Sequence, residues 1–254
     1  KPPMGEYFRQ TRTRTYSYLA AVPLLLAYEV LIVMGNRGSN DPVHVGAYVY
    51  TMRSFYAMLH GLGVSGNLWV GGILLGIGMI LHFSERKQGV EVAPGYFPVM
   101  LLECCLLAFG SAWLLGMAVQ TLIPNLWAQT LALNAQTPFA GTPVALRLAL
   151  ALGAGLYEEL VFRVLIFGLL ALAFKNAWHQ RPVLATCLAA LVASVIFSGV
   201  HYLPPLGDPL EAGSFLYRFL FGLVLTGLYA WRGFGIAAWT HALYDVMVLT
   251  WLQA

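Results

Sequence analysis

Long apolar runs separated by short polar segments dominate the chain. A helix needs about 20 mostly apolar residues to cross the hydrocarbon core of a bilayer. Seven runs approach or exceed that length, and none alternates in the period-two pattern of a strand. The runs cover residues 16–34, 62–83, 97–123, 144–174, 183–203, 214–231 and 234–252. The pattern predicts an all-α fold, a polytopic transmembrane helix bundle of about seven spans.

Two stretches depart from this simple pattern. Residues 35–61 mix charged and aromatic side chains, which predicts a loop with an interfacial amphipathic helix over about residues 44–60. The run 144–174 is longer than one span needs, and it contains Gly153 and Gly155. We expect these glycines to break it, so that a short surface helix precedes a span beginning near Gly155.

Composition supports the membrane interpretation. Hydrophobic residues make up 59% of the 254 residues and charged residues only 10%, whereas soluble domains carry about 25% charged residues. The net charge of +3 requires no nucleic-acid partner, so the bilayer is the expected partner. The three cysteines lie inside apolar runs without metal-type spacing or a disulfide framework. We expect one integral membrane domain over residues 1–254.

The positions of lysine and arginine predict the orientation. Seven spans place the segments 1–15, 84–96, 175–182 and 232–233 on one side of the membrane, and these segments hold most of the basic residues. Cytoplasmic loops carry the excess of lysine and arginine. That side, including the N-terminus, is therefore predicted to be cytoplasmic.

Two adjacent carboxylates and an arginine interrupt the fourth run. A charge at the bilayer centre costs about 2.5–3.5 kcal/mol on insertion scales, so these residues need a function or a partner. Arg163 follows Glu159 by four residues, which lets the two pair along one helix face. Adjacent helical residues point about 100° apart. Glu158 is therefore left without a local partner and is the carboxylate expected to react.

Two more polar motifs lie in later runs. His201 follows Phe197 by four residues in the fifth run, and Asp245 follows His241 by four in the seventh. Each pair lies on one helix face. Carboxylates and histidines together can activate water and transfer protons. Because each group alone is expensive in hydrocarbon, we expect all three motifs, within residues 155–252, to converge on one polar cavity.

These motifs, in this order on successive spans, resemble the CPBP family of intramembrane CAAX proteases and bacteriocin-processing enzymes, also called the Abi family. The resemblance covers roughly residues 144–252. It implies a glutamic-type endopeptidase that uses no cofactor and no metal. The implied substrate is a membrane-associated or C-terminally anchored protein, and the implied location is a bacterial inner membrane with a cytoplasmic N-terminus.

The resemblance also implies roles for the residues. Glu158 would be the general base, and His201 would help to activate the same water. Glu159 with Arg163 would shape the site and support it electrostatically.

The third motif differs from the family at its last position. His241 would position or stabilise the intermediate. The family often carries Asn where this chain has Asp245, and an amide can donate to the oxyanion. A carboxyl group donates only when it is protonated, so Asp245 either donates in that form or orients His241.

Alternatives to this mechanism remain open. Glu158, His201, His241 and Asp245 could ligate zinc as in a metalloprotease, although no His-Glu-x-x-His is present. The same carboxylates could form the relay of a proton-coupled transporter. A protein retained only for interaction or immunity is a third possibility, and a serine protease using Ser198 is a fourth.

The depths of the motifs predict which way the site opens. A span that starts near Gly155 places Glu158 close to its outer end, and His201 lies two residues before the end of the fifth run. His241 and Asp245 lie in the middle to outer half of the seventh run. We therefore expect the cavity to open toward the extracytoplasmic side, which argues against a prenylated cytosolic C-terminus as substrate.

Overall fold

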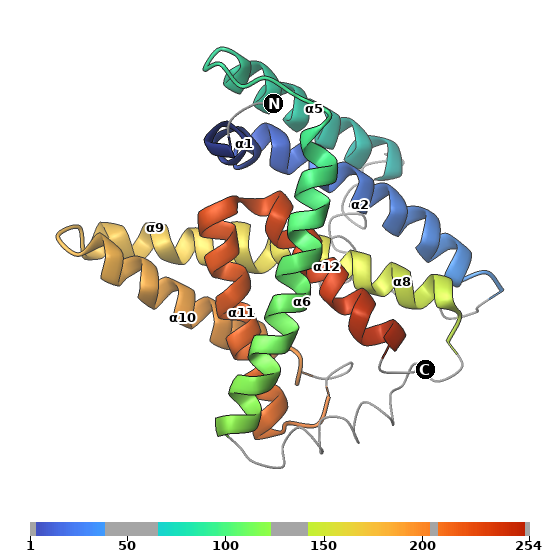
Figure 1. Ribbon diagram of the computed structural model, residues 1–254, viewed down its shortest axis with the longest axis vertical. Coiled ribbons are helices and arrows are strands. Elements are labelled where there is room, and N and C mark those ends of the chain that lie inside the picture. Colours follow the sequence, from blue (N-terminus) through green and yellow to red (C-terminus); the bar gives the residue numbers. More distant parts are fainter. Residues whose placement is uncertain (1–3, 39–65, 123–141, 204–207, 252–254) are drawn as a thin grey trace.

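The computed structural model describes residues 4–38, 66–122, 142–203 and 208–251, and every regular element in these ranges is a helix (Figure 1). The all-α prediction is confirmed for this part of the chain. In chain order the elements are α1 (Met4–Thr11), α2 (Arg14–Gly35), α5 (Gly66–Arg86), α6 (Tyr96–Leu122), α8 (Val144–Gly153), η2 (Ala154–Glu158), η3 (Leu160–Phe167), α9 (Gly168–Ala177), α10 (Pro182–Val200), α11 (Ala212–Arg232) and α12 (Phe234–Trp251).

Five helical runs within the described residues are long and apolar enough to cross a membrane. They are α2, α6, the continuous run Val144–Ala177, α10 and α11. Helix α12 has a shorter apolar stretch, Phe234–Leu249, and α5 covers most of the predicted run 62–83 without being among the five. The protein is thus an integral membrane protein, but the predicted count of seven spans is not confirmed. The interfacial helix predicted over residues 44–60 lies outside the described residues.

The predicted break at Gly153 and Gly155 is wrong. The chain remains helical from Val144 to Ala177, but it changes from an α-helix to the wider π-helix over η2 and η3. A break in hydrocarbon would leave backbone N–H and C=O groups without partners. Widening the helix keeps them paired, and π-helical segments occur frequently at functional sites.

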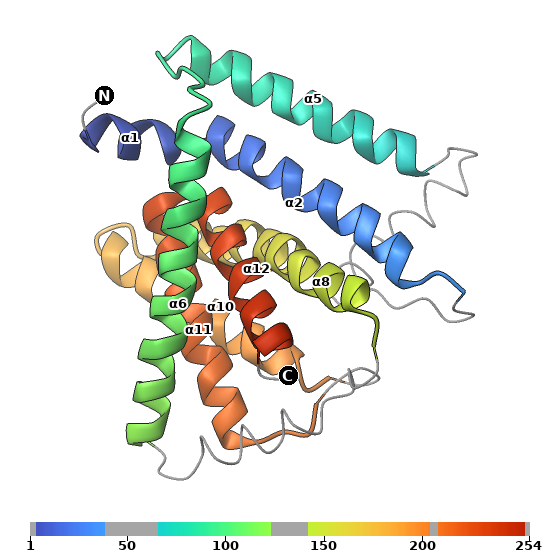
Figure 2. The ribbon, with the colours of Figure 1, turned by 45° about the vertical axis from the view of Figure 1, so that its right-hand side comes forward.

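Helix α12 is the centre of the bundle. It packs against α2, α6, α8, α11, η2 and η3, and it lies between α6 and α8 in both ribbon views (Figure 2). Ala237, Ala238 and Ala242 are fully buried on it. Small residues let transmembrane helices approach closely, which is how α12 contacts α2, α6, α11 and the run from α8 to η3 at once.

Helix α2 covers one side of this centre and α5 runs beside it (Figure 2). Leu24, Tyr28 and Ile32 of α2 pack against α8, η2 and α12. The Glu85 carboxylate, at the end of α5, accepts the backbone N–H groups of Arg14 and Thr15 at 3.0 and 2.7 Å. A carboxylate at this position caps α2 and complements its dipole, so α5 is fixed to the start of α2.

An ion pair between Arg232 and Glu103 fastens the end of the bundle that is predicted to be cytoplasmic. Arg232 donates to both carboxylate oxygens of Glu103 at 2.6 and 2.7 Å, and to the Thr11 hydroxyl at 2.9 Å. The Tyr7 hydroxyl donates to the same carboxylate at 2.6 Å. Burial, together with the Glu103 carboxylate, raises the pKa of Tyr7. This network joins α1, α6 and α11. It explains why Glu103, a charged residue, lies inside the apolar run 97–123.

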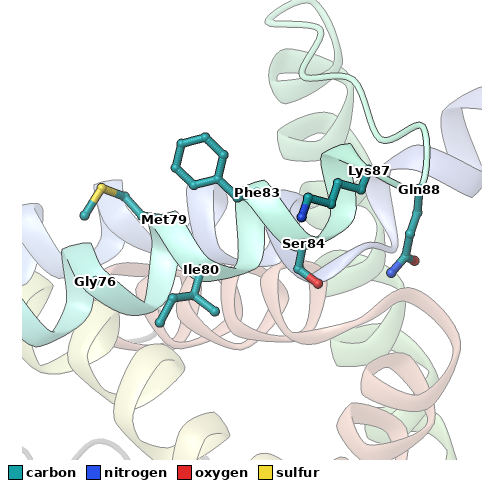
Figure 3. A pocket seen from close by; sticks show the side chains of 7 residues that line it. All are labelled: Gly76, Met79, Ile80, Phe83, Ser84, Lys87 and Gln88. Carbon is teal, nitrogen blue, oxygen red and sulfur yellow. The ribbon is translucent and has the colours of Figure 1, made fainter.

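A hollow of about 860 Å³ lies along the outer face of α5 (Figure 3). It is mostly apolar and is lined by Gly76, Met79, Ile80, Phe83, Ser84, Lys87 and Gln88. All of these residues lie on α5 or just beyond its end, and none belongs to the three polar motifs.

We predict that Gly155→Ala destabilises the protein. A Cβ at this position would lie 2.6 Å from the Ala238 carbonyl oxygen and 2.6 Å from the Ala242 backbone nitrogen. Backbone atoms cannot turn aside, so η2 must move away from α12. Overpacking of this kind costs about 1–3 kcal/mol, which thermal unfolding in detergent should register as a lower Tm.

Gly110→Ala and Gly227→Ala are the matched controls. Both glycines lie inside helices, and a Cβ on either meets no atom within 4 Å among the described residues. Alanine is favoured over glycine in a helix by up to about 1 kcal/mol. An equal response of all three variants would contradict the assigned close approach of η2 and α12.

Candidate active site

The Glu159 carboxylate joins two of the three motifs. Its Oε1 lies 2.9 Å from Arg163 Nη1 and 2.7 Å from His241 Nδ1. All three side chains are buried. The predicted pair of Glu159 with Arg163 is therefore present, and the same oxygen also bonds a histidine on α12. This contact links the π-helical run to the central helix.

Arg163 is enclosed by three helices besides its own segment. Its guanidinium lies 4.3 Å from the ring centroid of Phe197 on α10, and its Nη2 donates to the Gly222 carbonyl of α11 at 3.5 Å. Through Glu159 it also reaches α12. A buried cation needs a counter-charge and hydrogen-bond partners. Glu159 supplies the charge and Gly222 accepts from Nη2, whereas Nε has no hydrogen-bond partner among the described residues.

Glu158 points to a different part of the site. Its Oε2 lies 3.9 Å from His201 Nε2 and 4.0 Å from His241 Nε2. Direct N–H···O hydrogen bonds are 2.7–3.2 Å long, so neither histidine bonds it directly. The carboxylate thus faces two imidazoles from a distance that one water molecule can bridge.

His201 stands one residue beyond the end of α10. Its Nδ1 lies 2.7 Å from the Phe197 carbonyl oxygen, four residues earlier. A carbonyl only accepts, so Nδ1 carries the hydrogen. In the neutral ring Nε2 is then an acceptor, and this is the nitrogen that faces Glu158. The backbone therefore fixes the tautomer that a water-activating histidine needs.

His241 lies between two carboxylates. Its Nδ1 bonds Glu159, while its Nε2 is 3.5 Å from Asp245 Oδ2. The second distance exceeds that of a good hydrogen bond. Glu159, rather than Asp245, therefore sets the orientation of this ring.

Exposure divides the site into two faces. Three side chains form a buried support, and three form an accessible face with between 15% and 25% of each side chain exposed. The buried support consists of Glu159, Arg163 and His241, and the accessible face of Glu158, His201 and Asp245. The structure thus brings all six predicted residues together, three of them enclosed by the bundle and three partly exposed.

Phe197 contributes more than the sequence analysis assigned to it. Its ring packs edge-on to His201 and His241, with centroids 5.1 and 6.1 Å away, and it also lies under Arg163. Its carbonyl accepts from His201. The spacing of four residues before His201 was the available signal, since that spacing puts both residues on one face.

Metal ligation was one of the alternatives. Among the residues that the structure describes, no group of three or more His, Cys, Asp or Glu side chains is arranged to hold a metal ion. The expectation of a metal-free reaction stays a prediction.

Comparison with protein families agrees with the motifs. A family model described as type II CAAX prenyl endopeptidase Rce1-like matches residues 140–247. That segment includes all six residues of the site, and the match confirms the resemblance that the three motifs indicated. Neither a curated protein nor a solved structure matches the chain.

We predict that Arg163→Met costs stability, because it leaves the buried Glu159 carboxylate without its cation. Removing one partner of a buried pair typically costs about 3–5 kcal/mol. The double variant Glu159→Gln with Arg163→Met removes both charges and should recover much of the loss. Thermal unfolding of the three proteins in one detergent measures this. A double variant no more stable than Arg163→Met would show that the pair itself is not what the fold requires.

Proposed function

We propose, on the premise that residues 140–247 belong to the Rce1-like family of CAAX proteases, that this chain is an intramembrane endopeptidase of the glutamic type. The observation that carries the mechanism is the position of Glu158. It is accessible and faces two imidazole nitrogens at 3.9 and 4.0 Å, while its neighbour Glu159 is held in a buried ion pair.

The proposed reaction begins with a water molecule between Glu158 and His201. The water donates one hydrogen bond to the carboxylate and another to His201 Nε2, which the Phe197 carbonyl keeps as an acceptor. Its oxygen attacks the substrate carbonyl carbon while its proton passes to Glu158. Protonated Glu158 then gives that proton to the leaving nitrogen as the C–N bond breaks. One carboxylate thus serves as base and then as acid.

The buried support stabilises charge during this reaction. With both ring nitrogens protonated, His241 donates from Nδ1 to Glu159 and presents Nε2–H to the developing oxyanion. Glu159 stabilises that imidazolium, and Arg163 balances the carboxylate. Preorganised donors aimed at developing charge are commonly the largest single contribution to catalysis.

We propose that the substrate is a membrane-associated or C-terminally anchored protein. The polar cluster lies among helices that span the bilayer, so a scissile bond must reach it from a segment or tail held at the membrane. Lipid is accordingly a permanent partner.

We further propose that the site opens toward the extracytoplasmic side. Glu158 and His201 lie equally far along the chain from the turn that joins α9 to α10, and α10 packs against both α9 and η3. Both side chains are therefore at the end of this hairpin opposite to the basic turn with Lys175 and Arg181. Positive residues mark the cytoplasmic side.

Glu158→Gln and His201→Ala are expected to abolish proteolysis in a folded protein, because water attack needs the base and its partner. Comparison of protein termini in host cells that express the native chain or Glu158→Gln identifies substrates, and purified protein then cleaves them in detergent. Monodisperse variants that cut at the native rate would rule out these roles.

The same preparations separate the alternatives. If the protein is a proton-coupled transporter, cells that express the native chain will show no protein termini that are absent from cells with Glu158→Gln. A zinc enzyme contains stoichiometric zinc and loses activity to a chelator until zinc is restored, whereas the proposed mechanism predicts an unchanged rate.

Asp245→Asn is expected to retain substantial activity, and Asp245→Ala to lose most of it. The amide can donate to the oxyanion without a proton from solvent, and loss of one such donor costs about 10²–10³-fold in kcat. Steady-state rates on one substrate decide this. If Asn is as inactive as Ala, then Asp245 works as a carboxylate.

Cysteine labelling tests the orientation. Leu210→Cys and Gln180→Cys place an exposed thiol at opposite ends of α10, in a chain whose Cys104, Cys105 and Cys187 are replaced by serine. An impermeant thiol reagent added to intact cells should label the first and not the second. The reverse pattern would place the site on the cytoplasmic side and restore a cytosolic C-terminus as the substrate.

A further inference from the structure

Arg218 is a charged residue near the site that belongs to none of the three motifs. It lies on α11, which supplies no motif residue, and 27% of its side chain is exposed. Its Nη2 donates to Oδ2 of Asp208, whose side chain is 52% exposed. Ion pairs this exposed contribute little to stability, so the pair with Asp208 does not explain an arginine inside an apolar run.

The guanidinium of Arg218 makes hydrogen bonds through only some of its N–H groups. Its Nη1 is buried and has no hydrogen-bond partner within the described ranges. Arginine binds a carboxylate most strongly with two parallel N–H···O bonds. Arg232 does this with Glu103, through Nε and Nη2 onto both oxygens. Arg218 gives only Nη2 to Asp208, so donor capacity for a second acceptor remains.

The location of Arg218 ties it to the accessible face of the site. Its guanidinium lies 5.2 Å from the ring centroid of Tyr202, the residue after His201. The Asp208 backbone N–H donates to the His201 carbonyl at 2.8 Å. Arg218 therefore stands beside the end of α10, next to the segment that carries His201 of the accessible face.

We propose that Arg218 binds a carboxylate of the substrate peptide and so fixes which bond lies over Glu158. This inference rests on the proposed endopeptidase function. The carboxylate is either the C-terminal group of the substrate or an Asp or Glu side chain near the cleaved bond. It first displaces Asp208 from Nη2, since exchanging one exposed carboxylate for another costs little. Once Asp208 has moved away, the second oxygen of the substrate carboxylate accepts from Nη1, which has no partner among the described residues.

Peptide binding to the full-length Glu158→Gln protein tests this proposal without turnover. Three short N-acylated apolar peptides differ only at the end: a free C-terminal carboxylate, a C-terminal amide, and an amide with one Glu beside it. Dissociation constants are measured by fluorescence in detergent. At least one carboxylate peptide should bind about tenfold more tightly than the plain amide, as expected for a charge-assisted pair. Which of the two does so identifies the source of the carboxylate.

Arg218→Gln should abolish that preference by weakening the carboxylate peptide to the affinity of the amide. Arg181→Gln is the matched control, because it removes an exposed arginine at the other end of α10. It should leave the preference intact. Asp208→Asn removes the internal competitor and should strengthen carboxylate binding several-fold, which covers the case in which Arg218→Gln fails to fold.

Three results would overturn the proposal: equal affinities for all three peptides, a preference that survives Arg218→Gln, or a preference unchanged by Asp208→Asn. Because binding is read without cleavage, the carboxylate preference can hold even if the native chain cuts no protein. The failure of the proposed function and the failure of this inference are thus separate outcomes.

Discussion

A single buried carboxylate, Glu159, holds the site together. It neutralises Arg163 within its own helix and bonds His241 on the central helix α12. Without it the bundle would contain an unpaired guanidinium in hydrocarbon and an imidazole free to rotate. Arg163 in turn contacts α10 through Phe197 and α11 through Gly222. The relative positions of four helical segments therefore depend on one charge in a place where a charge alone is expensive.

That arrangement leaves Glu158, the base of the proposed reaction, without a direct hydrogen bond to either histidine. Glu158 neighbours Glu159 in the chain, yet it faces the accessible side, because successive residues on a helix point in different directions. Its imidazole partners are fixed by other groups, His201 by a backbone carbonyl and His241 by Glu159. Glu158 therefore meets two oriented rings without being bonded to either. A carboxylate held in an ion pair is a poor base. In this site Glu159 forms the ion pair, and Glu158 stays available for the proposed reaction.

The sequence predicted the parts of this site that depend on local spacing. The pair Glu159–Arg163 followed from four-residue spacing, and the convergence of three motifs from the cost of isolated polar groups in lipid. The sequence did not predict the π-helical widening, because Gly153 and Gly155 are equally compatible with a break in the helix. The need to pair every backbone N–H and C=O group in the bundle decides between the two. The contacts of Phe197 with Arg163 and His241, and the position of Arg218, depend on how α10 and α11 pack, which no local pattern specifies. The number of spans also could not be predicted from local pattern. The apolar stretch of α12 is shorter than a typical span, yet this helix lies at the centre of the bundle.

Helix α2 lies outside the segment that the family model matches, yet it packs directly against that segment. The family match begins at residue 140, but Tyr28 of α2 packs edge-on against Tyr157, the residue before Glu158, with ring centroids 5.2 Å apart. Leu24 and Ile32 belong to the same apolar cluster as α8 and α12. The N-terminal helices are therefore not an appendage to a catalytic module. The segment that the family model matches is therefore smaller than the part of the chain that encloses Tyr157 and the central helix α12.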